Sequence, residues 1–175
     1  MHPINKLSAF PTGTPDQVHI VIDTPRGTRN KVKWDEKLEM FVLSHVLASG
    51  ASFPYDFGFI PGTHAADGDA LDVLVLAEEP FFPGCLVVAR LIGGIEAEQT
   101  QDNETVRHDR LLAVPAASRN YAAVHELEDL PPTLFDEVEQ FFVYYNRMRG
   151  RIFRPIQRVG SAHAMLAVKL LAGKP

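Results

Sequence analysis

Short apolar segments separated by turn residues make up the first two thirds of the chain. The segment 18–23 (VHIVID) stops at Pro25, and the segment 31–36 (KVKWDE) alternates between apolar and polar positions. Such runs, bounded by Gly and Pro, predict β-strands. Further segments of this kind are 40–46, 57–60, 71–76, 85–92 and 110–114. Strands at this spacing predict a small closed barrel.

The last third changes to a helical period. Apolar residues recur at helical spacing after Thr133, which can cap a helix that ends near Gly150. They are Leu134, Val138, Phe141, Phe142 and Tyr145. The segment 161–171 predicts a second helix, with Ser161 as its N-cap and Gly173 as its stop. A barrel followed by helices, in a chain long enough for one sizeable core, predicts a single β-rich α+β domain over residues 1–175.

Composition and charge narrow the function classes. Hydrophobic residues make up 46% of the 175 residues and charged residues 22%, with a formal net charge of −5, which argues against a general nucleic-acid binder. No segment is apolar for long enough to span a bilayer, and the start, Met-His-Pro-Ile-Asn-Lys, has no basic region followed by an apolar core. Cys85 is the one cysteine, so no internal disulfide forms. We expect a cytoplasmic protein with no membrane segment.

An acidic turn precedes one of the predicted strands. The stretch 67–72 (DGDALD) holds three carboxylates, followed by the aliphatic run 73–76. Carboxylates this close repel one another unless cations or strong donors stabilise them. Hard oxygen ligands beside a Gly suit Mg²⁺, Mn²⁺ or Ca²⁺. The alternative is a solvated turn, since Asp-Gly is common turn chemistry; an EF-hand loop fits the spacing poorly.

The segments around this turn resemble a known signature. In chain order they are VIDTP (21–25), NKVKWD (30–35), FPYDFGFIPGT (53–63), DGDALDVLV (67–75), LAVP (112–115), DLP (129–131) and FFVYY (141–145). Together they resemble the soluble family I inorganic pyrophosphatases. The resemblance implies a five-stranded OB-like barrel with flanking C-terminal helices. It also implies hydrolysis of pyrophosphate with several Mg²⁺ ions, and a homo-oligomer, often a hexamer in bacteria.

The resemblance also implies roles for individual residues. Asp67 and Asp72 match positions that hold metal, and Asp69 matches the group that accepts a proton from the attacking water. Lys31 and Tyr145 match groups that bind phosphate. Pyrophosphate is highly charged, so its hydrolysis needs charge neutralisation and a nucleophile formed at neutral pH, both of which metal ions supply.

Other matched positions differ from the family pattern. Asp23 replaces a glutamate, so it keeps the charge of a metal ligand with a shorter reach. His45 stands where the family has a phosphate-binding arginine, and Arg151 stands where it has a lysine. For the acidic ligand of the loop 99–104 we select Asp102, with Glu104 as the alternative.

The segment before LAVP departs most. His108 and Arg110 stand where the family has a metal-binding aspartate and a lysine. Residues two apart on a strand share a face, so His108 and Arg110 are expected to point together while Asp109 points away. Imidazole favours transition metals over Mg²⁺, so Mn²⁺, Co²⁺ or Zn²⁺ become candidates for the metal.

Three hypotheses follow. The first is an active, divergent pyrophosphatase. The second is a pyrophosphatase-like protein with lost or altered activity that binds a metal or a phosphorylated ligand. It is motivated by the departures at His45 and His108, by Lys33 in place of a carboxylate and by Asn146 in place of a lysine, whereas Phe57 in place of a tyrosine is a milder change. The third is an OB-type module for single-stranded nucleic acid, which needs a basic groove with exposed aromatics. The acidic composition argues against the third, and the intact carboxylate turn favours the first.

Overall fold

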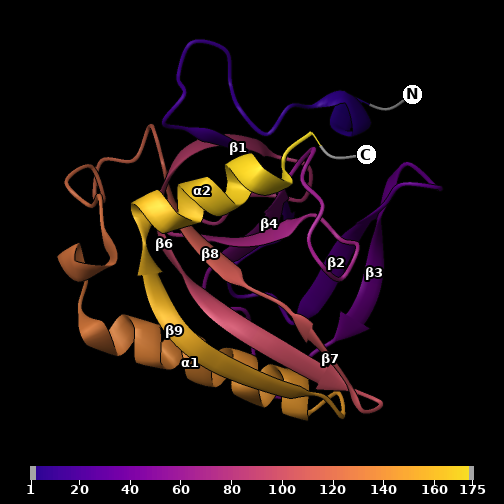
Figure 1. Cartoon of the computed structure of the whole chain (residues 1–175). Coiled ribbons are helices and arrows are strands. Elements are labelled where there is room, and N and C mark those ends of the chain that lie inside the picture. The colour runs from indigo at the N-terminus through magenta and orange to yellow at the C-terminus, as the bar shows by residue number, and fades with distance from the viewer. Residues whose placement is uncertain (1–2, 174–175) are drawn as a thin grey trace.

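The computed structural model describes residues 3–173. The first two residues of the N-terminal hexapeptide, Met1 and His2, lie outside the described residues. Figure 1 shows the elements. In chain order they are η1 (Pro3–Lys6), β1 (Val18–Thr24), β2 (Asn30–Asp35), β3 (Met40–Val46), β4 (Asp56–Ile60), β5 (Leu71–Val75), β6 (Leu86–Gln101), β7 (Glu104–Arg107), β8 (Arg110–Pro115), η2 (Leu127–Asp129), α1 (Pro132–Arg147), β9 (Ile152–Gly160) and α2 (Ser161–Leu171).

Five strands close into a ring, which confirms the predicted OB-like α+β fold. The order is β1-β4-β5-β8-β6, and β6 pairs back with β1 through Val18–Val21 and Leu86–Ala89. All these pairs are antiparallel except β5 with β8. The separate β2–β3 hairpin lies beside the ring (Figure 1). Closure leaves the paired barrel strands without free edges, as expected for a barrel.

The strand β6 is longer than the sequence pattern predicts, because it pairs with four other strands. Beyond the predicted segment 85–92 it continues to Gln101 and turns into β7. The backbone shifts register between Leu91 and Gly93, where φ is 146°. A Cβ at Gly93 would collide with the carbonyl oxygen of Val159 and the side chain of Leu127. Glycine therefore permits β6, β9 and η2 to meet at this point.

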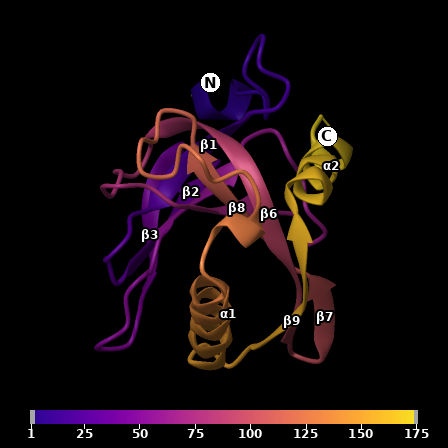
Figure 2. The ribbon, with the colours of Figure 1, turned by 90° about the vertical axis from the view of Figure 1, so that its left-hand side faces the viewer.

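The strand β9 was not predicted from the sequence. The helix α1 ends at Arg147, Gly150 turns the chain with a φ of 71°, and β9 begins at Ile152. Most of β9 is exposed, so its strand character comes from pairing with β6 from Gly93 to Thr100. Figure 2 shows α1 and α2 at opposite ends of β9.

The helices begin without the side-chain caps that the sequence suggested. The N-cap of α1 is Pro131, and no side chain caps it. The N-cap of α2 is Gly160, and Ser161 is instead the first helical residue. The backbone N–H of Ser161 donates to Glu126 Oε2 at 2.8 Å, and its hydroxyl donates to the other oxygen of the same carboxylate. A carboxylate at a helix start also complements the helix dipole.

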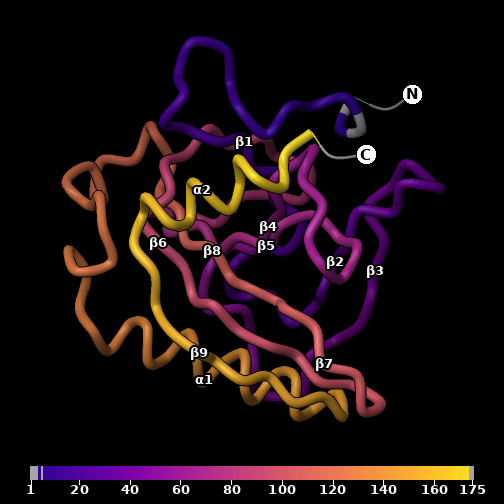
Figure 3. The backbone as a smooth tube through the Cα atoms, in the orientation of Figure 1, coloured from indigo at the N-terminus to yellow at the C-terminus, as the bar shows by residue number. Residues whose placement is uncertain are grey.

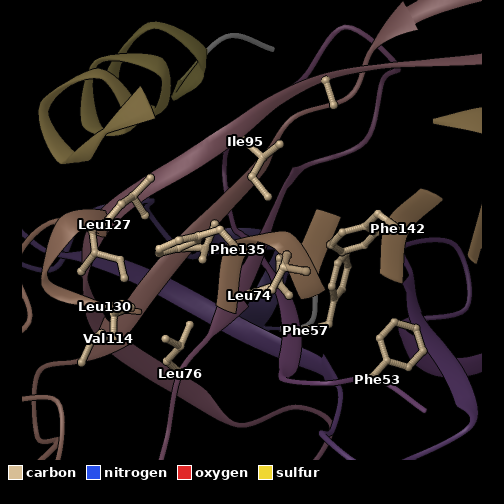
Figure 4. Packing of buried hydrophobic residues seen from close by; sticks show 14 of the residues in the cluster. Phe53, Phe57, Leu74, Leu76, Ile95, Val114, Leu127, Leu130, Phe135 and Phe142 are labelled. Atoms are coloured by element: carbon tan, nitrogen blue, oxygen red, sulfur yellow. The ribbon is translucent and has the colours of Figure 1, made fainter. Parts of the chain in front are cut away.

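Two apolar clusters bury both faces of the central strands. Val73 and Val75 belong to the cluster under α2, whereas Leu74 and Leu76 belong to the cluster against α1. This double burial explains the unbroken aliphatic run after the acidic turn. In Figure 4 Phe142 of α1 lies against Phe57 of β4, and their ring centroids are 6.0 Å apart. Burying one such side chain contributes about 1.5–3 kcal/mol.

The strands β4 and β5 run beside β8 in the middle of the molecule (Figure 3). The acidic turn lies directly before β5, and His108 lies directly before β8. The parallel pairing of β5 with β8 therefore brings the two segments to the same end of the barrel. None of the helices within residues 3–173 has the length and apolar character needed to cross a membrane.

Candidate active site

A cavity of about 230 Å³ opens beside the acidic turn. Its wall combines charged groups from β2, the turn, β8 and the end of α1 with aromatic rings from the core. The lining residues are Lys31, Lys33, Phe53, Phe57, Asp67, Asp69, Asp72, Gln99, His108, Arg110, Tyr145, Arg149 and Arg151. A second groove, of about 660 Å³, shares Lys33, Asp69 and Asp72 with the cavity. Asp69 and Asp72 therefore lie between the cavity and the groove, whereas Asp67 borders the cavity alone.

Local backbone geometry shapes the acidic turn. Gly68 has a φ of 86°, a conformation that glycine adopts without strain. Asp67 Oδ1 accepts a hydrogen bond from the N–H of Asp69 at 3.1 Å, and the carbonyl of Asp69 accepts one from Ala65 at 2.8 Å. These bonds hold Asp67 and Asp69 at the cavity before the chain enters β5, whose second residue is Asp72.

His108 and Arg110 face two of these carboxylates. His108 Nδ1 lies 2.7 Å from Asp67 Oδ2, which is close enough for an ion pair. The angle between the two groups does not meet the geometry of a hydrogen bond. Arg110 Nη1 lies 2.8 Å from Asp72 Oδ2, and His108 Nε2 lies 3.6 Å from the same oxygen. Burial alone would raise the pKa of Asp67, but His108, the backbone N–H of Asp69 and the charge of Arg110 together outweigh burial and lower that pKa. His108 therefore bridges two carboxylates.

Asp109 points away from the cavity, as strand alternation predicts. Its Oδ1 accepts a hydrogen bond from the N–H of Ala97 at 3.0 Å and pairs with Arg107. Arg110, by contrast, is only 4% exposed, and its Nε is buried with no hydrogen-bond partner among the described residues. A buried guanidinium N–H without a partner is costly, so a ligand that accepts hydrogen bonds would stabilise Arg110.

Behind the cavity wall lies a buried ion pair. Lys31 Nζ is 2.8 Å from Asp23 Oδ1 and 3.8 Å from the centroid of the Phe57 ring. Burial raises the pKa of Asp23 to about 6 despite the opposing charge of Lys31. Burial also lowers the pKa of Lys31, against the charges of Asp23 and Asp72. Each of the two buried charges is therefore stabilised by the opposite charge of its partner. Phe57 adds a cation–π contact to Lys31.

The turn that follows α1 supplies the other cations, Arg149 and Arg151. Arg149 Nη1 donates to Tyr145 Oη at 3.2 Å, and the ring of Tyr145 lies 5.5 Å from that of His45. Burial raises the pKa of Tyr145, so its phenol stays protonated at neutral pH and can donate a hydrogen bond. Burial and the charge of Arg149 lower the pKa of His45 to about 4, so its ring is neutral at pH 7. Its Nε2 is also buried without a hydrogen-bond partner.

The structure brings most of the residues selected from the sequence to the cavity. Lys31, Asp67, Asp69, Asp72, His108, Arg110, Tyr145 and Arg151 all line it. Asp23 lines the adjoining groove. His45 does not line the cavity, but its ring packs against that of Tyr145.

Asp102 and Glu104 are exposed at the β6–β7 turn, and neither lines the cavity. Asp102 instead accepts a hydrogen bond from Gln101 at 3.3 Å, and its charge acts on Arg151. Asn146 is buried and donates to the carbonyl of Phe142 at 2.9 Å, so it takes no part in the cavity wall.

Sequence reasoning gave no role to Lys33, Gln99 or Arg149, although all three line the cavity. Lys33 Nζ lies 3.1 Å from Asp69 Oδ2. The position of Lys33 two residues after Lys31 on a strand could have placed it there. Likewise, Arg149 follows Tyr145 by one helical turn. Gln99 comes from the unpredicted part of β6, so no sequence signal pointed to it.

The donor chemistry of the turn suits a divalent cation. The ion pairs of Asp69 and Asp72 use only Oδ2, and Oδ1 of each accepts no hydrogen bond from the described residues. Carboxylate oxygens are the ligands that Mg²⁺ prefers. Within residues 3–173, however, no three His, Cys, Asp or Glu side chains are already arranged around a common metal position. A bound ion would therefore share these carboxylates with His108, Arg110 and Lys33.

Comparisons with known proteins identify the family to which the chain belongs. A sequence model of the family described as inorganic pyrophosphatase matches residues 20–170. An inorganic pyrophosphatase of Nostoc sp. is 41% identical over 149 residues, which are 85% of each chain. One from Haloferax volcanii is 37% identical over 84% of this chain and 82% of its own. The crystal structure of inorganic pyrophosphatase from Thermus thermophilus superposes with a TM-score of 0.88 at 29% identity, covering 97% of both chains.

Proposed function

The chain belongs to the inorganic pyrophosphatase family and hydrolyses inorganic pyrophosphate to two phosphates, and we propose that the cavity beside the acidic turn is its active site. One observation carries this proposal. Three carboxylates that suit a divalent cation face five cationic side chains across a single small cavity. Phosphoryl transfer requires both kinds of group, cations for the phosphates and oxygen ligands for metal.

Membership of the family implies a divalent metal cofactor. We propose Mg²⁺, held by Asp67 and Asp72, with Asp23 reaching from the adjoining groove. Because His108 touches both of the first two carboxylates, Mn²⁺, Co²⁺ and Zn²⁺ are also candidates. A bound divalent ion supplies charge neutralisation and lowers the pKa of a water molecule. Asp102 is proposed as a further metal ligand, although it lies outside the cavity wall and only its charge acts on Arg151.

The cationic and phenolic groups are proposed to bind the phosphates. Arg110 is buried and has an unpartnered Nε that can donate to a phosphate oxygen. Lys31 is fixed by Asp23 and presents a compact charge, whereas Arg149 and Arg151 present planar guanidiniums at the cavity mouth. Tyr145 donates a hydrogen bond from its protonated phenol. The neutral ring of His45 is proposed to hold Tyr145 in place and to donate at the cavity edge.

Asp69 is proposed to accept a proton from the attacking water. It lies at the cavity, and its side chain is 65% exposed, so water reaches it without a conformational change. Of the three turn carboxylates it is the one paired with a lysine, and the other two contact His108. This difference in partners matches the proposed difference in roles.

A pyrophosphatase-like protein with altered activity is the alternative, because every carboxylate of the turn already has a cationic or imidazole partner. Phosphate release from pyrophosphate, measured with Mg²⁺, Mn²⁺, Co²⁺ and Zn²⁺ in parallel, separates the two. We expect turnover that falls by at least about 100-fold in Asp69→Asn and Asp72→Asn. Asp16→Asn, at an exposed site outside the cavity, is the matched control and should retain activity. Absence of turnover with all four metals would favour the alternative.

We also propose a cytoplasmic homo-oligomer, with the hexamer that the family resemblance implies as the first expectation. On α2, Leu166 and Leu170 are 54% and 57% exposed, and on β3 Met40 and Leu43 are 62% and 60% exposed. Large apolar side chains exposed in a single chain are available for an interface. Size-exclusion chromatography with light scattering measures the mass of the particle directly. If the protein has the mass of a single chain at micromolar concentration, the proposed oligomer is rejected.

A further inference from the structure

The cavity has more positive than negative side chains before any metal binds. Lys31, Lys33, Arg110, Arg149 and Arg151 line it together with three carboxylates. A pocket that depends wholly on divalent ions for phosphate binding needs an acidic wall, because the ions supply the positive charge. Here Asp23 offsets the charge of Lys31, with which it pairs at 2.8 Å, and the five cations still outnumber the four carboxylates by one.

Lys33 places an ammonium group at one oxygen of the Asp69 carboxylate. Its Nζ is 3.1 Å from Asp69 Oδ2, and it borders both the cavity and the adjoining groove. Burial alone would lower the pKa of Lys33, but the charges of Asp69, Asp72 and Asp23 and the bond to Asp69 raise it. Lys33 is therefore fully charged at neutral pH. Its side chain is 51% exposed, so it can also contact a ligand in the cavity.

We propose that Lys33 is a built-in cation of the site, taking the place of a divalent ion at Asp69 and enabling pyrophosphate to bind to the metal-free protein. The proposal rests on the proposed function and assigns Lys33 a role in substrate binding. A divalent ion approaching Asp69 has to compete with an ammonium that is already in contact. Pyrophosphate, in contrast, gains the charge of Lys33 together with that of Lys31 and the three arginines.

The test measures pyrophosphate binding by calorimetry with metal-stripped protein in a chelating buffer. Wild-type protein is expected to bind. Lys33→Gln should weaken binding by about tenfold and Lys33→Glu by about a hundredfold, because each unit of charge removed near a phosphate changes the affinity by about this factor. Lys169→Glu is the matched control, since Lys169 is an exposed lysine of α2 that lines neither the cavity nor the adjoining groove. It makes the same change in net charge and should alter the affinity less than about threefold.

Circular dichroism on each variant establishes that it is folded, and Lys33→Gln provides a milder change if Lys33→Glu does not fold. Wild-type protein that fails to bind pyrophosphate without metal would overturn the proposal, even if it turns pyrophosphate over with metal. Equal affinities of Lys33→Glu and Lys169→Glu for pyrophosphate would also overturn it. Metal-free binding that depends on Lys33 supports the inference, whereas loss of turnover with every metal counts against the proposed function alone.

Discussion

Replacing Lys31 with methionine tests whether the ion pair behind the cavity is a structural unit. Lys31 and Asp23 are 4% and 5% exposed, and their charged atoms are 2.8 Å apart. Methionine keeps most of the packing but leaves the Asp23 carboxylate buried without a counter-charge. Removing one partner of a buried pair costs about 3–5 kcal/mol. We expect the free energy of unfolding to fall by this amount at pH 8.

Urea unfolding in metal-free buffer, followed by the fluorescence of the single Trp34, measures the loss. At pH 5 the loss should be smaller, because Asp23 then binds a proton and leaves no unpaired charge. The double variant Asp23→Leu with Lys31→Met removes both charges and should lie within about 2 kcal/mol of wild type. A loss below about 1 kcal/mol for Lys31→Met, or a double variant that loses the sum of the two single changes, would refute the reasoning.

Three further predictions concern the site and the barrel. Arg110→Met should lower kcat/KM by about 100-fold or more, since it removes a buried cation next to Asp72; exposed Arg147→Met is the control, and equal kcat/KM values for both variants would contradict the assignment. In metal-free buffer, stability should fall by about 3 kcal/mol as the pH rises from 4 to 6, because the pKa of Asp23 is about 6 when folded and 3.8 when unfolded. Between pH 4 and 6 the native protein holds a proton on Asp23 that the unfolded chain has lost, so this stabilisation is present at low pH and disappears as the pH rises. In Asp23→Asn, the free energy of unfolding measured with urea should not fall with pH in this way. Gly93→Ala should cost about 3 kcal/mol or more, against about 1 kcal/mol for Gly13→Ala, whose Cβ meets no neighbour; similar losses in a thermal melt would exclude a packing role for Gly93.

The sequence pattern predicted the strands whose signal is local. The segments that became β1, β2, β3, β4, β5 and β8 alternate or run apolar between turn residues, so short-range rules locate them within about two residues. The pattern missed the extension of β6, which is buried or half-buried up to Thr100. It also missed the strands β7 and β9, which are largely exposed. An exposed strand carries little apolar periodicity, and its conformation depends on hydrogen bonds to a partner far away in the chain.

One part of the candidate site could be predicted from the sequence, and the other part could not. Three of its carboxylates lie within six residues, so the sequence alone identified the acidic turn and its suitability for a divalent cation. The partners of these carboxylates come from residues about 35 to 40 positions away: Lys33 for Asp69, His108 for Asp67 and Arg110 for Asp72. No periodicity or spacing links such residues, because barrel closure brings them together.

The sequence by itself therefore determined the fold class, the acidic turn, the shared face of His108 and Arg110 and the family resemblance, all of which rest on neighbouring residues or on motifs in chain order. Only the tertiary structure decided that Asp102 lies outside the cavity wall, that Asn146 is buried in α1 and that Lys33 pairs with Asp69. The physical reason is that electrostatic interactions depend on distance in space. The charge balance of the cavity exists only once β2, β5, β8 and the end of α1 have met around it.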